Sequence, residues 1–330
     1  MRGRRRRQPE RRLPRALSPA LLLASGIFFG QIAAALAQQA DEASTQALAA
    51  AAQNPVAAMY SLPFQNNTYF GAGPNHDKTY DVLNIQPVLP FTVGDWNIIS
   101  RTIAPLIYVP SVRTGLGTAT LDEDTTSASA GPAGIPETFG LGDINQTFYF
   151  SPAAPSAFIW GAGPSFDLPT ATERFIGSGK LSVGPAAVGA VMSSPWVIAL
   201  LTRQLFSIAG PNGRTDVNQT LLQPSVNYNL PGGWYFTSSP VITTNWSADS
   251  SQRWSVPIGG GVGKIFKIGD QPINSSFQAY DYVEHPSLAP RWALRFQMQF
   301  LFPRGASRSQ TDRQRHRGQV SARSMREMRC

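Results

Sequence analysis

The feature that most constrains this chain is a period of two in its hydrophobicity, which is clearest near its C-terminal end. Between residues 291 and 302, apolar residues such as Trp292, Phe296 and Phe300 alternate with polar residues such as Arg295 and Gln297. Successive side chains of a β-strand point to opposite faces of the sheet. The pattern therefore predicts a strand with one apolar face and one polar face.

Similar segments recur along most of the chain, and short and long connections alternate between them. A length of about ten residues suits a β-strand that crosses a bilayer at a tilt. We therefore predict an all-β fold: a closed antiparallel up-and-down transmembrane β-barrel of about 12 strands with a short N-terminal helix. The predicted strands are 64–71, 80–89, 96–108, 142–151, 158–168, 181–193, 196–208, 219–230, 234–246, 253–266, 272–283 and 291–302.

The two ends of the chain differ from this body. An Arg-rich start and an apolar run from Leu17 to Leu36 end in small residues, which predicts a signal peptide over 1–37 that is cleaved after Ala37. An uncleaved membrane anchor is the alternative. The segment 38–60 is expected to be a leader with a short Ala-rich helix, which either plugs the barrel or lies in the periplasm. The barrel is assigned to 61–303, and the Arg-rich tail 304–330 is expected to be disordered.

The net charge of +8 comes from these ends. Residues 1–37 contain eight Arg and one Glu, and residues 304–330 contain eight Arg, one Asp and one Glu, so the remaining body carries a net negative charge. The body therefore gives no electrostatic reason to expect nucleic-acid binding. Cys330 is the one cysteine, so no disulfide can hold the exported body together, and closure of a barrel in lipid would do so.

The tryptophans fall at the ends of the predicted strands. An indole ring has an apolar body and a polar N–H group, and it prefers the interface between bilayer and water. We therefore expect an interfacial girdle formed by Trp96, Trp160, Trp196, Trp234, Trp246, Trp254 and Trp292.

The polar faces of the strands are predicted to line a lumen. Neutral amides there would suit small polar or weakly polar solutes, and Arg295 would favour anions. The loop 109–141 is long enough to fold inward as a constriction. The expected lumen-lining residues are Asn84, Gln86, Asn145, Gln223, Asn227, Asn229, Arg295, Gln297 and Gln299.

Motifs for catalysis, cofactors and metals are weak. The run Gly259–Lys264 has the wrong spacing for a phosphate-binding loop, since Ile265 stands where Ser or Thr is needed. His76 and His285 fall in predicted loops without a recognisable nucleophile or second metal ligand. Asp122–Asp124 could hold a divalent cation, although a solvated charge run is the simpler interpretation. We expect no enzyme activity, no cofactor and no metal.

Several ordered motifs carry a family resemblance, among them YNLPGGWY (228–235), VPIGGGVGK (256–264) and LRFQMQFLF (294–302), with further ones at 51–57, 61–68, 83–88, 159–164 and 168–172. The chain resembles bacterial outer-membrane proteins that are often labelled "neuromedin U", which are related to a family linked to meta-pathway phenol degradation. The resemblance covers residues 45 to 303. It implies a β-barrel channel or transporter and supplies no catalytic residues.

The sequence thus predicts an outer-membrane channel that passes small solutes, and the family resemblance implies hydrophobic or aromatic ones. Its expected partners are outer-membrane lipid and lipopolysaccharide, the barrel assembly machinery and a small-molecule solute. The alternatives are a closed structural or adhesion barrel, an outer-membrane hydrolase and a water-soluble periplasmic β-sandwich.

Overall fold

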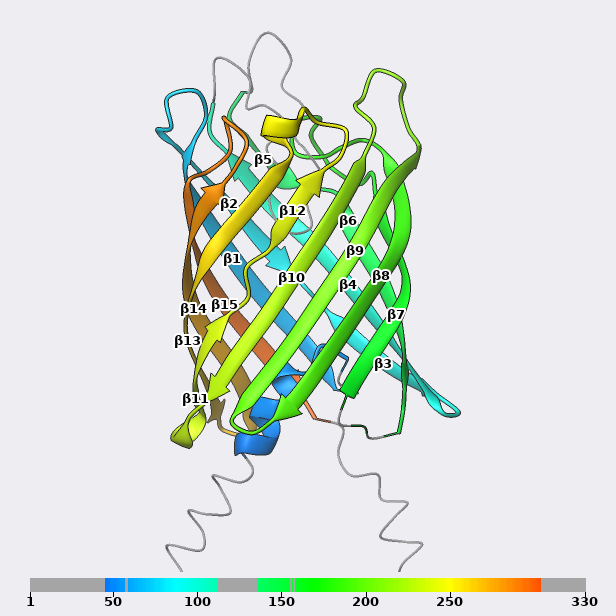
Figure 1. Ribbon diagram of the computed structural model, residues 1–330, viewed down its shortest axis with the longest axis vertical. Helices are drawn as coiled ribbons and strands as arrows, with labels where there is room; N and C mark the ends of the chain where they lie inside the picture. Colours follow the sequence, from blue (N-terminus) through cyan, green and yellow to red (C-terminus); the bar gives the residue numbers. More distant parts are fainter. Residues whose placement is uncertain (1–44, 57–58, 112–135, 155, 157, 304–330) are drawn as a thin grey trace, which may run out of the picture. The chain divides into compact units, whose positions relative to one another are not determined.

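The computed structural model describes residues 45–56, 59–111, 136–154, 156 and 158–303. The expected signal peptide, the Arg-rich tail, the middle of the loop 109–141 and the Asp122–Asp124 run lie outside these residues. The described part is a β-barrel with a short helix over 45–53 at one end (Figure 1).

Fifteen strand segments form the twelve strands of the wall. Three strands are divided, because β2 and β3, β5 and β6, and β11 and β12 each share a common neighbour in the sheet. Prolines at 87 and 240 lie in two of the breaks, where a residue without an N–H group interrupts the ladder. The segments are β1 (Tyr60–Ala72), β2 (Lys78–Ile85), β3 (Val88–Val93), β4 (Trp96–Val109), β5 (Thr138–Leu141), β6 (Ile144–Pro152), β7 (Phe158–Leu168), β8 (Leu181–Ser193), β9 (Trp196–Ala209), β10 (Asn218–Asn229), β11 (Trp234–Ser238), β12 (Ile242–Asn245), β13 (Trp254–Ile268), β14 (Gln271–Glu284) and β15 (Trp292–Phe302).

The sheet closes on itself because β1 pairs with β15 along their full lengths, from Tyr60 opposite Phe302 to Phe70 opposite Trp292. All pairings are antiparallel, and each strand lies beside its neighbours in the sequence. In hydrocarbon an open edge would leave N–H and C=O groups without partners, and a closed ring has no such edge. The predicted fold, a closed barrel of 12 antiparallel strands with one short N-terminal helix, is confirmed.

The two ends of the barrel differ in their connections. At one end, which we call the turn end, short connections such as 94–95, 194–195 and 269–270 join the strands. The helix 45–53 lies at this end (Figure 1). At the other, the loop end, the connections are longer and include 169–180 and 210–217.

The alternation in β15 shows which residues face outward from the wall and which face the interior. Phe296 is 45% exposed, whereas its neighbour Arg295 is 5% exposed although it carries a charge. In a water-soluble sandwich the apolar face would be the buried one. The wall thus turns large apolar side chains outward and polar ones inward, as a transmembrane barrel requires.

The glycine-rich run in β13 serves close packing. Gly263 is paired with Tyr235 across the sheet, and a Cβ atom on Gly263 would lie 2.1 Å from Cζ of the Tyr235 ring. The missing side chain therefore makes room for a buried aromatic ring inside the barrel.

Candidate functional site

The nine residues predicted to line a lumen are all buried or half-buried, and their lumen-lining role remains a prediction. Eight of them lie in strands, and Gln86 lies in the break between β2 and β3. Asn84, Gln86, Asn145, Asn227, Arg295 and Gln299 are buried, whereas Gln223, Asn229 and Gln297 are half-buried.

One side of the interior is a network of amides and hydroxyls. The Tyr235 hydroxyl donates to Asn274 Oδ1 at 2.5 Å, and Asn274 Nδ2 donates to Gln299 Oε1 at 3.0 Å. Gln278 accepts a short hydrogen bond from the Tyr280 hydroxyl. Buried polar groups need such partners, because each missing hydrogen bond costs roughly 1–3 kcal/mol.

Arg295 belongs to this network. Its Nε donates to Asn67 Oδ1 at 2.8 Å, its Nη1 donates to the Ser239 carbonyl at 2.9 Å, and its guanidinium lies 4.9 Å from the centroid of the Tyr280 ring. These contacts fix the side chain against the wall. Because its N–H groups are engaged in this way, the guanidinium stabilises the interior and attracts anions only through its charge, without donating these hydrogen bonds to them.

The other side of the interior is apolar, which the sequence analysis did not predict. Ile99, Ile103 and Ile107 of β4 all point inward and are 0% exposed. From Ile103 to Val109 the strand is apolar on both faces, so the period of two is hidden there. Arg101 lies on the inward face between Ile99 and Ile103, and its Nη2 donates to Gln86 Oε1 at 3.0 Å. The apolar run 103–109, beside strands that alternate, was the signal that could have revealed the inward isoleucines.

Two of these isoleucines belong to clusters of buried apolar side chains, and Ile103 lies between them on the same face of β4. Ile107 belongs to a cluster near the loop end, formed by Tyr69, Ala72, Tyr80, Val82, Ile107, Val109, Ile176 and Ala293. Ile99 belongs to a cluster nearer the turn end, formed by Val56, Ile99, Tyr149, Ala186 and Val188. We call the line of Ile99, Ile103 and Ile107 with its two clusters the apolar track.

The leader enters the turn end of the barrel. The helix 45–53 packs through Ala49 against Tyr235 and Ile265 of the wall. Gln53 Nε2 donates to Asn229 Oδ1 at 2.9 Å, and Asn229 Nδ2 donates back to Gln53 Oε1 at 3.2 Å. The helix is therefore held inside the barrel by a reciprocal amide pair as well as by apolar packing.

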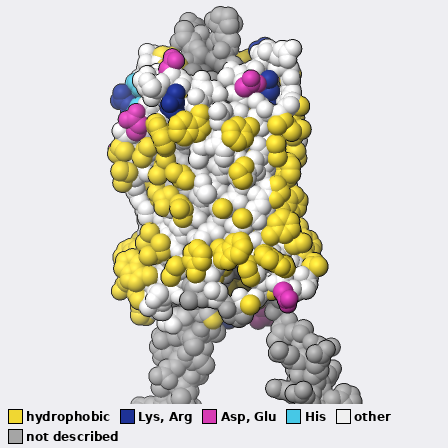
Figure 2. All heavy atoms as spheres, turned by 45° about the vertical axis from the view of Figure 1, so that its right-hand side comes forward, with side chains coloured by type: hydrophobic (Ala, Val, Ile, Leu, Met, Phe, Trp, Pro, Cys, Tyr) yellow, Lys and Arg dark blue, Asp and Glu magenta, His cyan; other side chains and the backbone are white. Residues whose placement is uncertain are grey.

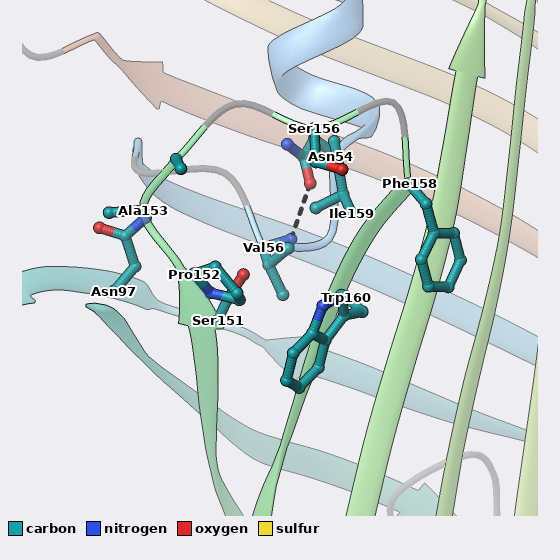
Figure 3. A pocket seen from close by; sticks show the side chains of 11 residues that line it. Asn54, Val56, Asn97, Ser151, Pro152, Ala153, Ser156, Phe158, Ile159 and Trp160 are labelled. Carbon is teal, nitrogen blue, oxygen red and sulfur yellow. Dashed lines mark hydrogen bonds between the residues drawn. The ribbon is translucent and has the colours of Figure 1, made fainter. Parts of the chain in front are cut away.

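Beyond the helix, the leader turns into the interior. The Asn54 Oδ1 atom accepts a hydrogen bond from the Val56 N–H group at 3.0 Å, and Val56 packs into the cluster with Tyr149 (Figure 3). A cavity of about 340 Å³ lies between the leader and the turn-end segment of the wall around Ser151 and Trp160.

Two further cavities, of about 160 and 220 Å³, adjoin the other side of the leader. They share lining residues, including Gln65, Leu201 and Gln223, so they lie next to each other. Each is lined by amides and by aliphatic side chains. These two cavities are thus small and amphiphilic, and Arg101 adds a charged group to the lining of the second.

The loop end is narrowed by the β7–β8 loop, residues 169–180. Ile176 of this loop is 0% exposed and packs against Tyr69, Tyr80 and Ile107 inside the barrel. The constriction predicted for the loop 109–141 remains a prediction, because most of that loop lies outside the described residues. The pair Phe175–Ile176 in an otherwise polar loop was the signal for the loop that is seen to fold inward.

The outer face carries the tryptophans. Six of them, Trp96, Trp160, Trp196, Trp234, Trp246 and Trp292, are 40–48% exposed, and Trp254 is half-buried. Apolar side chains cover much of the outer wall, and the coloured charges lie toward its two ends (Figure 2). The interfacial role of these rings remains a prediction.

The two histidines make local contacts through their Nδ1 atoms. His76 Nδ1 contacts the Gly71 carbonyl at 3.1 Å, and His285 Nδ1 contacts the Pro286 carbonyl at 2.9 Å. Within the described ranges, no three His, Cys, Asp or Glu side chains come close enough together to hold a metal ion. No helix in the same ranges is long and apolar enough to cross a membrane.

The sequence matches no protein-family model and no curated protein. Among solved structures, the chain is similar to the COG4313 outer membrane channel from Pseudomonas putida F1, with a TM-score of 0.54 and 13% identity over 76% of this chain and 97% of that one. It is more weakly similar to the β domain of the Bordetella autotransporter BrkA, with a TM-score of 0.38 and 11% identity over 74% and 99% of the two chains. The Pseudomonas putida toluene transporter TodX gives a TM-score of 0.35 and 9% identity over 74% and 87%. The first match confirms the expected fold of a bacterial outer-membrane β-barrel.

Proposed function

We propose that the protein is an outer-membrane channel that passes small apolar or weakly polar solutes along the apolar track. With an even number of strands, the turn end faces the periplasm and the loop end faces the outside. The observation that carries the proposal is that Ile99, Ile103 and Ile107 of β4 are 0% exposed in a barrel that also buries many amides.

A channel for ions or sugars has a different requirement. Such solutes need polar groups along their whole path to replace water, and the side chains of Ile99, Ile103 and Ile107 offer none. Arg101, which lies between the first two, is hydrogen-bonded to Gln86 of the wall. An apolar solute loses little on leaving lipid or a carrier for this surface, while the amides opposite keep a polar substituent hydrogen-bonded. The name of the channel with the similar fold is consistent with transport, and the solute class rests on the interior alone.

The test is uptake of N-phenyl-1-naphthylamine, a small apolar dye that fluoresces after it has crossed the outer membrane. Cells that produce the full chain are compared with empty-vector cells, with the variant Ile103→Asn and with the control Ile103→Ala, which keeps the track apolar. An unpaired amide in the track costs an apolar solute ~1–3 kcal/mol, so Ile103→Asn should slow uptake roughly 5- to 100-fold.

A heat-modifiability gel shows that each variant has folded. Uptake by the wild type that equals the empty vector would contradict the proposal and favour a closed structural barrel. Equal loss in Ile103→Asn and Ile103→Ala would show that the track does not select the solute. Planar-bilayer recording of the purified protein separates an ion-conducting pore from a path that admits apolar molecules only.

A further inference from the structure

Ile176 of the β7–β8 loop fills a pocket that is formed by residues of the barrel wall. It lies in a connecting loop, where side chains are usually exposed, and yet it is 0% exposed. Its neighbours Tyr69, Tyr80 and Val109 come from β1, β2 and β4, which are fixed by strand pairing. The pocket is therefore built by the wall, and the loop supplies only what fills it.

The wall of this pocket suits a flat ring. The Tyr69 and Tyr80 rings are stacked, with centroids 4.7 Å apart and an angle of 23° between their planes, and Tyr282 lies 6.5 Å from Tyr69. Ile107 and Val109 add aliphatic surface. Aromatic rings gain from offset-stacked and edge-to-face contacts in addition to apolar burial. None of the cluster residues carries a charge, so the pocket favours an uncharged ring.

The loop is held on the pocket by hydrogen bonds at its two ends. The Asp143 carboxylate accepts from the Ala171 N–H group at 3.1 Å and from the Ser178 N–H group at 2.7 Å. The Thr172 N–H group donates to the Leu141 carbonyl at 2.9 Å. Between these anchors, only Phe175 and Ile176 are large apolar residues.

A second loop adds contacts from the side. Arg214 Nη1 donates to the Arg174 carbonyl at 2.7 Å, and Lys180 Nζ lies 3.0 Å from Asp216 Oδ1. Gly179 has a φ of +66°, a conformation that glycine adopts without strain, beside the Arg214 side chain. Lys180 is buried, but its partner Asp216 and the Arg214–Arg174 contact are exposed, so water can replace these partners when the loop moves.

We propose that the pocket now filled by Ile176 is the outward-facing binding site for the solute, an uncharged monocyclic aromatic molecule with at most one small polar group. In the absence of solute, the Ile176 side chain occupies this pocket. When the loop 169–180 moves away from the barrel, the side chain leaves the pocket, and the ring of the solute packs against Tyr69 and Tyr80 instead. This inference rests on the proposed function and specifies its solute class and its first site.

The first experiment measures binding of 4-iodophenol to the purified full chain in detergent by titration calorimetry. Ile176→Ala removes the competing side chain, so the affinity should rise about tenfold, since a site that is rarely vacant binds more weakly in proportion. Ile208→Ala is the matched control, because Ile208 lies on β9 and is 63% exposed. Cyclohexanol, which is not flat, should gain less than 4-iodophenol does. Anomalous scattering from iodine in crystals of Ile176→Ala should place the ring beside Tyr69.

The second experiment locks the loop without changing Ile176. A Cβ atom on Gly140 lies 3.5 Å from Cβ of Thr172, within the range for a disulfide, so Gly140→Cys with Thr172→Cys should cross-link the loop to β5. Cys330→Ser is included in this variant and in its control to exclude other pairings. The δ-methyl of Ile176, 3.1 Å from the new Cβ atom, must shift slightly. The oxidised protein should bind 4-iodophenol at least tenfold more weakly than the reduced protein, which should regain the affinity of the Cys330→Ser control.

The outcomes separate this inference from the proposed function. Unchanged affinity in Ile176→Ala, iodine density elsewhere, or equal binding by the oxidised and reduced proteins would each overturn the inference, even if dye uptake still depends on Ile103. Loss of dye uptake in all chains, with ring binding intact beside Tyr69, would instead overturn the channel. The reversible disulfide keeps the inference testable if Ile176→Ala fails to fold.

Discussion

A buried charge on the outer wall should be far more costly than the same charge inside the barrel. Phe277 of β14 and Gln297 of β15 lie near the middle of their strands, and Gln297 is paired with Ser276, the neighbour of Phe277. The two positions therefore share one depth in the membrane. Phe277 is 51% exposed on the outer face, whereas Gln297 lines the inner cavities.

The perturbation is an arginine at either position. On the lipid face near the bilayer midplane, an arginine costs ~2–4 kcal/mol, and Phe277 is flanked by Phe296 and Val262, which offer no polar partner. At Gln297 the guanidinium meets amides such as Gln65, so the cost should stay within ~1 kcal/mol. The difference corresponds to a roughly 10- to 100-fold change in the folding equilibrium.

The assay is reversible unfolding by guanidinium chloride in phospholipid vesicles, followed by tryptophan fluorescence, with Phe277→Leu as the control for the lost ring. Phe277→Arg should lower the free energy of unfolding by several times the loss in Gln297→Arg. Equal losses, or a larger loss for Gln297→Arg, would refute the assignment of the two faces and with it the membrane-spanning barrel.

Three further predictions concern the contacts at the two ends. Asn229→Ala removes the reciprocal pair with Gln53, so the leader should loosen by ~1–3 kcal/mol and planar-bilayer recordings should show more frequent current steps; an unchanged trace would mean that apolar packing alone seats the helix. Asp143→Ala removes the acceptor of the Ala171 and Ser178 N–H groups, which should speed proteolysis of the loop 169–180, and protection equal to the wild type would argue against its role as an anchor. The hydrogen bond and charge of Lys180 lower the pKa of Asp216, so this pair stabilises the loop above pH ~4 and is lost as the pH falls through that lowered pKa. The protection of amides in 169–180 against hydrogen exchange, relative to their intrinsic rates at each pH, should therefore fall on acidification in the wild type and not in Asp216→Asn, and identical pH profiles of protection would contradict this assignment.

The strands could be predicted from the sequence because one face of a barrel wall meets lipid and the other meets the polar interior. This difference imposes a regular alternation of apolar and polar residues on the sequence. The predicted segments 158–168 and 181–193 coincide with β7 and β8, and the final segment 291–302 begins one residue before β15. The breaks at Pro87 and Pro240 were missed, since a local interruption in one ladder leaves the alternation on either side intact.

The site was less predictable, because its character depends on contacts between distant segments. The amides were predicted from the period of two, but residues 103–109 of β4 are apolar on both faces and give no period to detect. The inward turn of Ile176 depends on Asp143, which lies in a different connection. The effect expected of Arg295 on anions was inferred from its charge alone, whereas its hydrogen bonds to Asn67 and Ser239 appear only once the strands are paired.

The contacts of the leader helix with late strands of the wall determine when the helix can dock during assembly of the barrel. Gln53 and Asn229 are 176 residues apart in the chain, and the helix also rests on Tyr235 and Ile265. The leader is exported before the wall, and it can therefore dock only after the chain has been placed as far as β13. An incomplete barrel must pass through a stage in which the helix is not docked, so variants that stall between β10 and β13 should leave the helix accessible to protease.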